Sequence, residues 1–330
     1  NFFDKKECED LNIFFIRVPF DNLSIKNFLI RNDIKTLLFS VNVHSIFPLR
    51  LARIAASMNI NTIHVIDYWN GYSSRMMLDR KVLFQPRRYL VPDIYAKKMA
   101  INEGIDEDKI VVTGQPALAD AEEAFLRNKS NLFYKLPQVS RNKKIILFVS
   151  EPVKFDQGVS LQENENFRGY VEKDSLKILI DALKNLENEF YLILLPHPRQ
   201  NLKELSYIWK TLGGDSYGCI IANTKGRNFL PFVSGVSGMS STLLYEAWLV
   251  GIPILSIQPG LINDSLRMMQ YKRNVTFIDR YDCSTSDAKK WLKFLNFNTK
   301  HIFQSDMKLH TDSPKLVAKE VLSLHSKVKG

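Results

Sequence analysis

The chain contains few cysteines, and none of them is spaced as in a zinc site. Its 330 residues include only Cys8, Cys219 and Cys283, and an odd number of thiols fits a reducing compartment better than a disulfide framework. No run approaches the ~18 apolar residues of a membrane span, and residues 1–12 lack the basic and then apolar profile of a signal peptide. We therefore expect a cytoplasmic protein without a metal site.

The chain also lacks low-complexity segments, short repeats and any recognisable nucleic-acid-binding module, so we expect no nucleic-acid partner. Its net charge of +10 nevertheless favours anionic ligands. The basic residues are dispersed, with small clusters at Lys81, Arg87 and Arg88 and at Arg141, Lys143 and Lys144. These clusters fit peripheral contact with an anionic inner membrane face or with an acidic ligand, and they fit an ordinary solvated surface as well.

Apolar runs alternate with amphipathic stretches along the whole chain, which is typical of parallel sheets with crossover helices. The runs predict strands at residues 13–18, 36–41, 62–66, 89–91, 110–113, 145–149, 191–195, 218–222, 233–236 and 254–257. Helical spacing predicts helices at residues 49–58, 94–103, 174–188, 202–212, 241–250, 266–271, 287–297 and 313–327.

The fold class that follows is α/β, with two Rossmann-like domains and an interdomain cleft. We place the first domain at residues 1–135, a polar and basic linker at 136–144, and the second domain at 145–312. A final helix at 313–330 is expected to pack back on the first domain. The polar segment 155–170 is either a mobile active-site loop or unstructured chain.

The most informative stretch is residues 233–260, which predicts a strand, a Gly/Ser turn, a helix and a second strand. Gly238, Ser240, Ser241 and Thr242 form the turn, where serine can cap the helix and backbone N–H groups can bind a phosphate. Glu246 lies one helical turn further on the same face as Thr242 and can bind ribose hydroxyls. The alternative is an ordinary βα turn that binds nothing, with Glu246 in solvent.

A second candidate is His197, in the sequence Leu195-Pro196-His197-Pro198-Arg199 directly after a predicted strand. A histidine at the carboxyl end of a parallel strand faces the ligand crevice and can stabilise a leaving phosphate. Arg199 can add a charge-assisted phosphate contact, or it can be a surface residue.

The first domain offers a candidate general base in Asp67, directly after the predicted strand 62–66, with His44 as the second choice. The alternative for Asp67 is to cap a following helix. Aromatic residues and a cation nearby are either acceptor-binding residues or core: Tyr68, Trp69, Tyr72 and Arg75.

These motifs resemble the GT-B fold of nucleotide-sugar glycosyltransferases and UDP-N-acetylglucosamine 2-epimerases. The resemblance implies phosphate contacts from the serine turn, ribose contacts from Glu246, and a position for Glu151 where the first loop of the second domain approaches the donor. The His-Pro element with a Ser-Ser pair is similar to transferases that use CMP-activated acidic sugars. The family's use of protein donors implies a reaction without a metal or other cofactor.

The predicted function is an inverting, metal-independent glycosyltransferase of surface-polysaccharide assembly. Its partners would be a nucleotide-sugar donor, with a CMP-activated acidic sugar preferred to a UDP-sugar, and a glycan or lipid-linked acceptor. The alternatives are an enzyme like UDP-GlcNAc 2-epimerase and a nucleotide-sugar-binding protein without turnover. The epimerase motifs expected after the first and last strands of the second domain are replaced by Ser150-Glu151-Pro152-Val153 and Gln258-Pro259-Gly260-Leu261.

Overall fold

The computed structural model describes residues 17–41, 45–78, 82–129, 142–184, 186, 189–263, 267, 269, 272, 275–297 and 302–326. The chain divides into two compact units, each of which is described by itself. Unit 1 comprises Asn1–Asp67, Gly71–Val112 and Leu316–Gly330, and unit 2 comprises Tyr68–Asn70 and Thr113–Lys315. The domain limits expected from the sequence remain a prediction, because units defined by contacts need not coincide with domains that fold alone.

Unit 1 is built on a parallel four-stranded sheet with the order β1-β2-β5-β6. Its strands are β1 (Thr36–Phe39), β2 (Asn61–Val65), β5 (Arg88–Val91) and β6 (Ile110–Val112). Its helices are α2 (Asn22–Arg31), α3 (Phe47–Ser57), α4 (Ile94–Asn102) and most of α12 (Ser313–Ser326). A short antiparallel hairpin joins β3 (Met77–Leu78) to β4 (Val82–Leu83).

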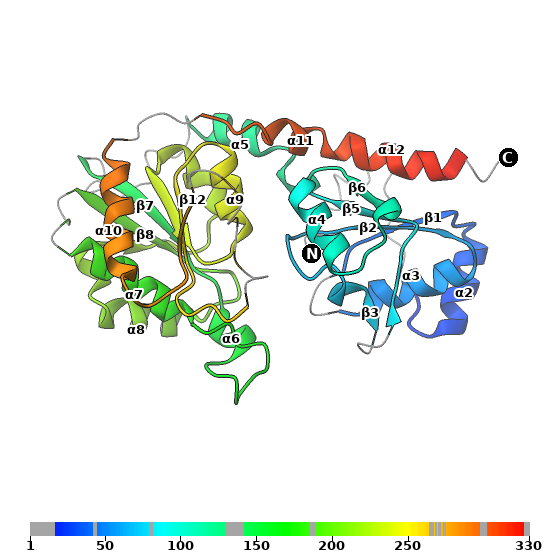
Figure 1. Cartoon of the computed structure of the whole chain (residues 1–330), viewed down its shortest axis with the longest axis horizontal. Coiled ribbons are helices and arrows are strands. Elements are labelled where there is room, and N and C mark those ends of the chain that lie inside the picture. The colour runs from blue at the N-terminus through cyan, green and yellow to red at the C-terminus, as the bar shows by residue number, and fades with distance from the viewer. Residues whose placement is uncertain are drawn as a thin grey trace. The chain divides into compact units, whose positions relative to one another are not determined.

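Different helices pack on the two faces of this sheet. Ile63 and Leu90 form a buried cluster with Val317 and Leu324 of α12. Leu37 points to the opposite face, because the register pairs its neighbour Leu38 with Ile63, and it packs with α2 and α3. Figure 1 shows α12 along one side of the unit 1 sheet and α2 and α3 on the other.

Unit 2 contains a parallel six-stranded sheet with the order β12-β11-β10-β7-β8-β9. The strands are β7 (Lys144–Val149), β8 (Phe190–Leu195), β9 (Gly218–Ile220), β10 (Gly235–Gly238), β11 (Ile254–Ile257) and β12 (Val275–Ile278). Counted along the chain, this is the 3-2-1-4-5-6 order of doubly wound dinucleotide-binding domains. The strand order reverses between β7 and β10, and ligands of such sheets bind at the carboxyl ends of strands at that point.

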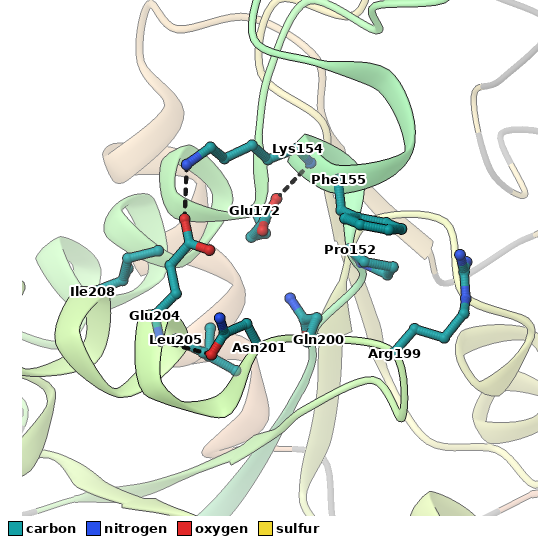
Figure 2. A pocket seen from close by; sticks show the side chains of 10 residues that line it. All are labelled: Pro152, Lys154, Phe155, Glu172, Arg199, Gln200, Asn201, Glu204, Leu205 and Ile208. Atoms are coloured by element: carbon teal, nitrogen blue, oxygen red, sulfur yellow. Dashed lines mark hydrogen bonds and ion pairs between the residues drawn. The ribbon is translucent and has the colours of Figure 1, made fainter.

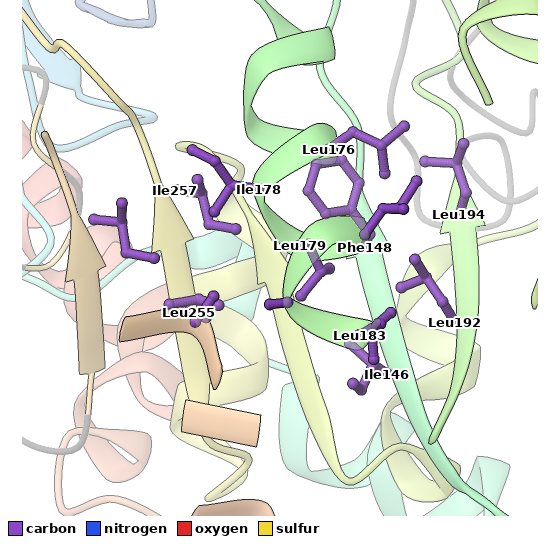
Figure 3. Packing of buried hydrophobic residues seen from close by; sticks show 14 of the residues in the cluster. Ile146, Phe148, Leu176, Ile178, Leu179, Leu183, Leu192, Leu194, Leu255 and Ile257 are labelled. Atoms are coloured by element: carbon purple, nitrogen blue, oxygen red, sulfur yellow. The ribbon is translucent and has the colours of Figure 1, made fainter. Parts of the chain in front are cut away.

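Helices cover both faces of the unit 2 sheet. The helices α7 (Glu172–Leu183), α8 (Leu202–Thr211) and α10 (Ser284–Leu295) bury one face, while α9 (Thr242–Leu249) packs on β10 and β11 from the other. Figure 3 shows the first interface, where Leu179 of α7 lies over Phe148 and Leu255 of the strands. Smaller helices are α5 (Ala121–Asn128), α6 (Val153–Gln157) and α11 (Met307–Thr311).

The α/β fold class is confirmed, and the differences from the predicted elements have local causes. The strand predicted at 233–236 lies at β10, Gly235–Gly238, because the residues before it form a 3₁₀ helix, Gly226–Phe232. The strand β12 and the helices α2, α5, α6 and α11 were not predicted. Most of the predicted strand at 13–18, of the predicted helix at 266–271 and of the linker at 136–144 lies outside the described residues, and the described residues 17–18, 267 and 269 belong to neither a strand nor a helix.

Candidate functional site

The carboxyl ends of four neighbouring unit 2 strands carry a row of polar residues. The parallel register places these residues side by side: Leu195, Val149, Gly238 and Ser256. The polar residues follow two positions later in each strand, and we call them the edge row: His197, Glu151, Ser240 and Gln258. The middle pair, Glu151 and Ser240, lies at the point where the strand order reverses, which is the expected ligand position.

Ser240 is the most heavily bonded member of the edge row. Its backbone N–H donates to Glu151 Oε1 at 2.5 Å, and its hydroxyl donates to Glu151 Oε2 at 2.7 Å. Arg168 Nη1 lies 2.8 Å from the same hydroxyl oxygen, and the Tyr68 hydroxyl donates to the Ser240 carbonyl. One carboxylate, one guanidinium and one phenol therefore fix this serine in a single orientation.

Buried polar groups extend this network toward β11. Gln258 is 1% exposed, and its amide nitrogen donates to the Tyr170 hydroxyl at 2.9 Å. Burial raises the pKa of the Tyr170 phenol to about 12, so this group stays protonated at neutral pH. Burial opposes the charge on Arg168, but Tyr170 and Glu151 beside it outweigh that effect and raise the pKa of the guanidinium.

His197 is oriented by the turn in which it lies. Its backbone N–H donates to Gln200 Oε1 at 2.8 Å, and its Nδ1 accepts the backbone N–H of Arg199 at 3.1 Å. The neutral imidazole must therefore carry its proton on Nε2. Burial and the charge of Arg199 lower the pKa of His197, so the neutral donor form prevails at pH 7. Gln200 joins the turn to β7 by donating to Ser150 Oγ at 2.9 Å.

The helix α9 begins and ends as the sequence predicts. The Ser241 side chain caps its start by accepting the N–H of Leu243, and Thr242 is the first helical residue. Gly251 follows its end with φ +82°, and its N–H donates to the Trp248 carbonyl at 2.9 Å. The first turn of such a helix presents N–H groups without intrahelical partners and a positive dipole end.

Gly238 ends β10 where the backbone cannot accept a side chain. A Cβ at this position would lie 2.8 Å from the Val149 carbonyl oxygen and 3.0 Å from the Leu244 side chain. The glycine therefore allows β10, β7 and α9 to meet closely under the edge row.

Glu246 is almost fully buried and belongs to an ion-pair cluster. Arg227 Nε lies 2.8 Å from Glu246 Oε1, and Arg227 Nη1 lies 2.9 Å from both carboxylate oxygens of Asp120. Burial raises the pKa of Glu246, and the charge of Arg227 opposes this shift. The predicted ribose contact stays a prediction, and the structure gives this carboxylate an internal cation.

The aromatic residues expected to bind an acceptor have partners within the protein. The rings of Trp69 and Tyr245 stack with centroids 4.2 Å apart, and Tyr245 Oη lies 3.1 Å from Nε2 of the buried His310. The Tyr72 side chain is also buried, and its backbone carbonyl accepts the hydroxyl of Tyr89. The predicted binding of an acceptor sugar by these rings stays a prediction.

Asp67 and Arg75 form an ion pair in unit 1, with 2.6 Å between Arg75 Nη1 and Asp67 Oδ1. Arg75 also donates to the Val41 carbonyl at 2.7 Å. Asp67 does not cap the next helical segment, a 3₁₀ turn at Ser74–Met76, since Ser73 holds the N-cap position. His44 lies outside the described residues.

A pocket of about 380 Å³ lies between α6, the start of α7 and the start of α8. Figure 2 shows Lys154 reaching across it to Glu204, with Phe155 and Arg199 at its rim. Arg199 is held by a bidentate ion pair with Asp156, at 2.7 and 2.8 Å. The predicted contact of Arg199 with phosphate stays a prediction.

No group of three or more His, Cys, Asp or Glu side chains in the described part of the chain could hold a metal ion. None of the helices described is long and apolar enough to cross a membrane.

Several residues of the network were not predicted from the sequence. They are Arg168, Tyr170, Gln200, Arg227 and Gln258. Of these five, only Gln258 had a signal in the sequence, namely its position directly after a predicted strand. His197 and Glu151 likewise lie within two residues of the end of a predicted strand. Arg168 and Tyr170 lie in the segment 155–170, whose weak patterning concealed them.

Comparison with solved structures identifies the fold. UDP-GlcNAc 2-epimerase from Methanocaldococcus jannaschii is similar with a TM-score of 0.64 and 16% identity, over 97% of this chain and 89% of that one. The Neisseria meningitidis UDP-GlcNAc 2-epimerase bound to UDP-GlcNAc has a TM-score of 0.59 and 14% identity, over 92% of this chain and 80% of that one. Anabaena Alr3699/HepE in complex with UDP and glucose has a TM-score of 0.56 and 12% identity, over 98% of this chain and 87% of that one.

No protein-family model matches the chain, and no curated protein was found to match it. At these identities the structural likeness shows the fold alone. The chain therefore has the two-domain, GT-B-like α/β fold of these enzymes.

Proposed function

We propose that the protein is an enzyme that acts on a UDP-sugar, and that the start of α9 holds the diphosphate together with Ser240 and His197 of the edge row. The observation that carries this proposal is the position of Ser240, at the strand-order reversal and beside the first turn of α9. Backbone N–H groups at such a position suit phosphate oxygens. Solved proteins of this fold contain UDP-GlcNAc or UDP, which supports uridine over the cytidine nucleotide favoured by the sequence.

Epimerisation is the reaction we propose first, since several similar structures are UDP-GlcNAc 2-epimerases. Glycosyl transfer to a glycan or lipid-linked acceptor is the second candidate. It is favoured by the neutral His197, whose Nε2–H can donate to a leaving phosphate, and by the absence of the epimerase motifs at 150–153 and 258–261. A binding protein without turnover would hold the same nucleotide and change nothing.

Thermal unfolding with UDP, CDP, CMP and GDP tests the ligand class. We expect UDP and UDP-GlcNAc to raise the midpoint, since a ligand at 100 times its Kd stabilises the folded state by about 2.7 kcal/mol. Stabilisation by CMP alone would instead support the CMP-activated sugar donor that the sequence favours. No stabilisation by any nucleotide would contradict the proposal.

The reaction is tested by following UDP-GlcNAc in an NMR tube without acceptor. A new C2 epimer at equilibrium identifies an epimerase. Release of UDP only when an acceptor is added identifies a transferase. Binding with neither product leaves the binding-protein alternative.

We further propose that unit 1 contacts anionic lipid at the outer face of α2. Phe20, Leu23 and Ile30 are at least 65% exposed there, and Lys26 lies between the two aliphatic residues. Arg50 of α3 adjoins this face, because it donates to Asn22 Oδ1 at 2.6 and 2.9 Å. Exposed apolar side chains with a lysine and an arginine beside them fit a membrane surface that carries negative charge.

Flotation with vesicles tests this contact. We expect the protein to float with vesicles that contain phosphatidylglycerol and not with phosphatidylcholine alone, because each cation at the surface contributes about 1 kcal/mol. The variant Leu23→Asp should lose flotation, and Leu322→Asp, a matched exposed leucine on α12, should keep it. Equal flotation of Leu23→Asp and the parent protein would contradict the proposal.

A further inference from the structure

The carboxylate of Glu151 takes up hydrogen-bond donors of Ser240 in the edge row. It accepts two hydrogen bonds from Ser240, one from the backbone N–H and one from the hydroxyl. These are the two kinds of donor that bind phosphate oxygens at the turn before a helix. A carboxylate of the chain itself therefore takes up both of these Ser240 donors.

Arg168 provides the cation of this site. Its Nη1 lies 2.8 Å from Ser240 Oγ, and its charge lies close enough to Glu151 to be stabilised by it. The Nε–H of Arg168 is buried and makes no hydrogen bond within the described part of the chain. A phosphate oxygen that replaced the carboxylate would find both a fixed cation and an unused donor.

We propose that Glu151 is a specificity-determining residue that must leave Ser240 before phosphate binds, and that it discriminates against nucleotides with a terminal phosphate. This inference rests on the proposed function, because it concerns the same diphosphate site. The bound phosphate replaces the carboxylate on the Ser240 donors and on Arg168. The displaced carboxylate remains on the same turn, held near the site by Pro152 and by the Glu151 carbonyl, which accepts from Gln200.

The charge of the ligand determines how strongly Glu151 opposes it. The terminal phosphate of UDP carries about −1.5 to −2 charges at neutral pH, whereas each phosphate of a UDP-sugar is a diester with one. A nearby carboxylate repels the terminal phosphate more, and this repulsion is strong where water is largely excluded. Glu151 therefore favours the intact UDP-sugar over free UDP.

The competing explanation is that Glu151 only orders Ser240 for the ligand. The two explanations predict opposite signs for Glu151→Gln. Glutamine has the same shape and can still accept one hydrogen bond from Ser240, but it has no charge. If Glu151 competes with phosphate, the variant binds UDP more tightly; if it orders Ser240, the variant binds more weakly.

Isothermal titration of UDP and UDP-GlcNAc into the parent protein and Glu151→Gln tests the proposal. We expect UDP affinity to rise about 10-fold and UDP-GlcNAc affinity to rise less. The matched control is Glu204→Gln, a neighbouring carboxylate that pairs with Lys154 and touches no member of the edge row. We expect both affinities of this control to be unchanged.

Weaker or unchanged UDP binding by Glu151→Gln, with the parent protein binding UDP, would overturn the role of Glu151 and leave the proposed function standing. No binding of either ligand by any of the three proteins would overturn the proposed function itself. Thermal unfolding of each variant confirms that it is folded, and Glu151→Ala repeats the test with the side chain removed.

Discussion

Arg227→Ala is expected to lower the free energy of unfolding of unit 2 by about 3 kcal/mol at neutral pH. The substitution leaves Glu246, which is 6% exposed, as a buried carboxylate without its cation. It also removes the bidentate contact with Asp120. A buried charge without a partner is among the few single changes that cost this much.

The loss of unfolding free energy in Arg227→Ala should become smaller as the pH falls. Burial already raises the pKa of Glu246 in the parent protein, and removal of Arg227 takes away the opposing charge. A carboxyl group whose pKa is higher in the folded than in the unfolded state binds more protons when folded, so stability rises as pH falls through the folded value. The difference between variant and parent should therefore be largest above pH 7 and should shrink in acid.

Denaturant unfolding followed by tryptophan fluorescence measures this effect, and the fluorescence signal comes from unit 2. All four tryptophans, Trp69, Trp209, Trp248 and Trp291, belong to that unit. Arg199→Ala is the matched control, because its ion pair with Asp156 is exposed and should be worth less than 1 kcal/mol. An Arg227→Ala variant no less stable than Arg199→Ala would contradict the role given to the Glu246 pair.

His197→Ala is expected to reduce turnover of a UDP-sugar by about 10² to 10³-fold, as removal of one preorganised donor does elsewhere. The hydrogen bond from Arg199 N–H to Nδ1 leaves the proton on Nε2, directed away from the turn. That N–H can donate to the bridging oxygen of the leaving phosphate in either reaction proposed. Because the His197 side chain is only partly buried, the variant should stay folded.

The activity of the parent protein should be insensitive to pH through the ordinary histidine range. Burial and Arg199 lower the pKa of His197, so the neutral donor form persists above that lowered value and is lost only in more acidic solution. In the acid form, Nδ1 also carries a proton and clashes with the Arg199 N–H. Activity that falls with a midpoint at or above 6.5 would assign the proton donor to another group.

Unfolding by tryptophan fluorescence should show the same midpoint for His197→Ala and the parent protein. Added imidazole should restore part of the activity, because it supplies the missing donor. Activity equal to the parent without imidazole would remove His197 from the mechanism.

The elements of unit 2 were largely predictable because each has its own local signal. Apolar runs identified β7, β8 and β11, and Gly251 identified the end of α9. β10 was displaced by two residues because its last positions are Ser237 and Gly238, which have low strand propensity and are held there by pairing on both sides.

The contacts of the site were less predictable than its members. Glu151, Ser240 and His197 could be chosen because each follows a strand, and the fold brings those strand ends together. The hydrogen bonds between Glu151 and Ser240 could not be predicted, since 89 residues separate the two. No local pattern shows that Glu246 would meet Arg227, or that Trp69 would stack on Tyr245, because such pairings are decided by tertiary packing.

In the edge row, the length of each turn decides which residue reaches the site, and this matters more than the composition of the turn. Every member lies two residues beyond a registered strand position, so the common sheet sets where all four side chains stand. A substitution of one member changes its hydrogen bonds, as between Glu151 and Ser240, and leaves the sheet unchanged. Deletion of a single residue between Val149 and Glu151 would instead put Pro152 at the position of Glu151, and the protein would lose the function of Glu151 without losing its fold.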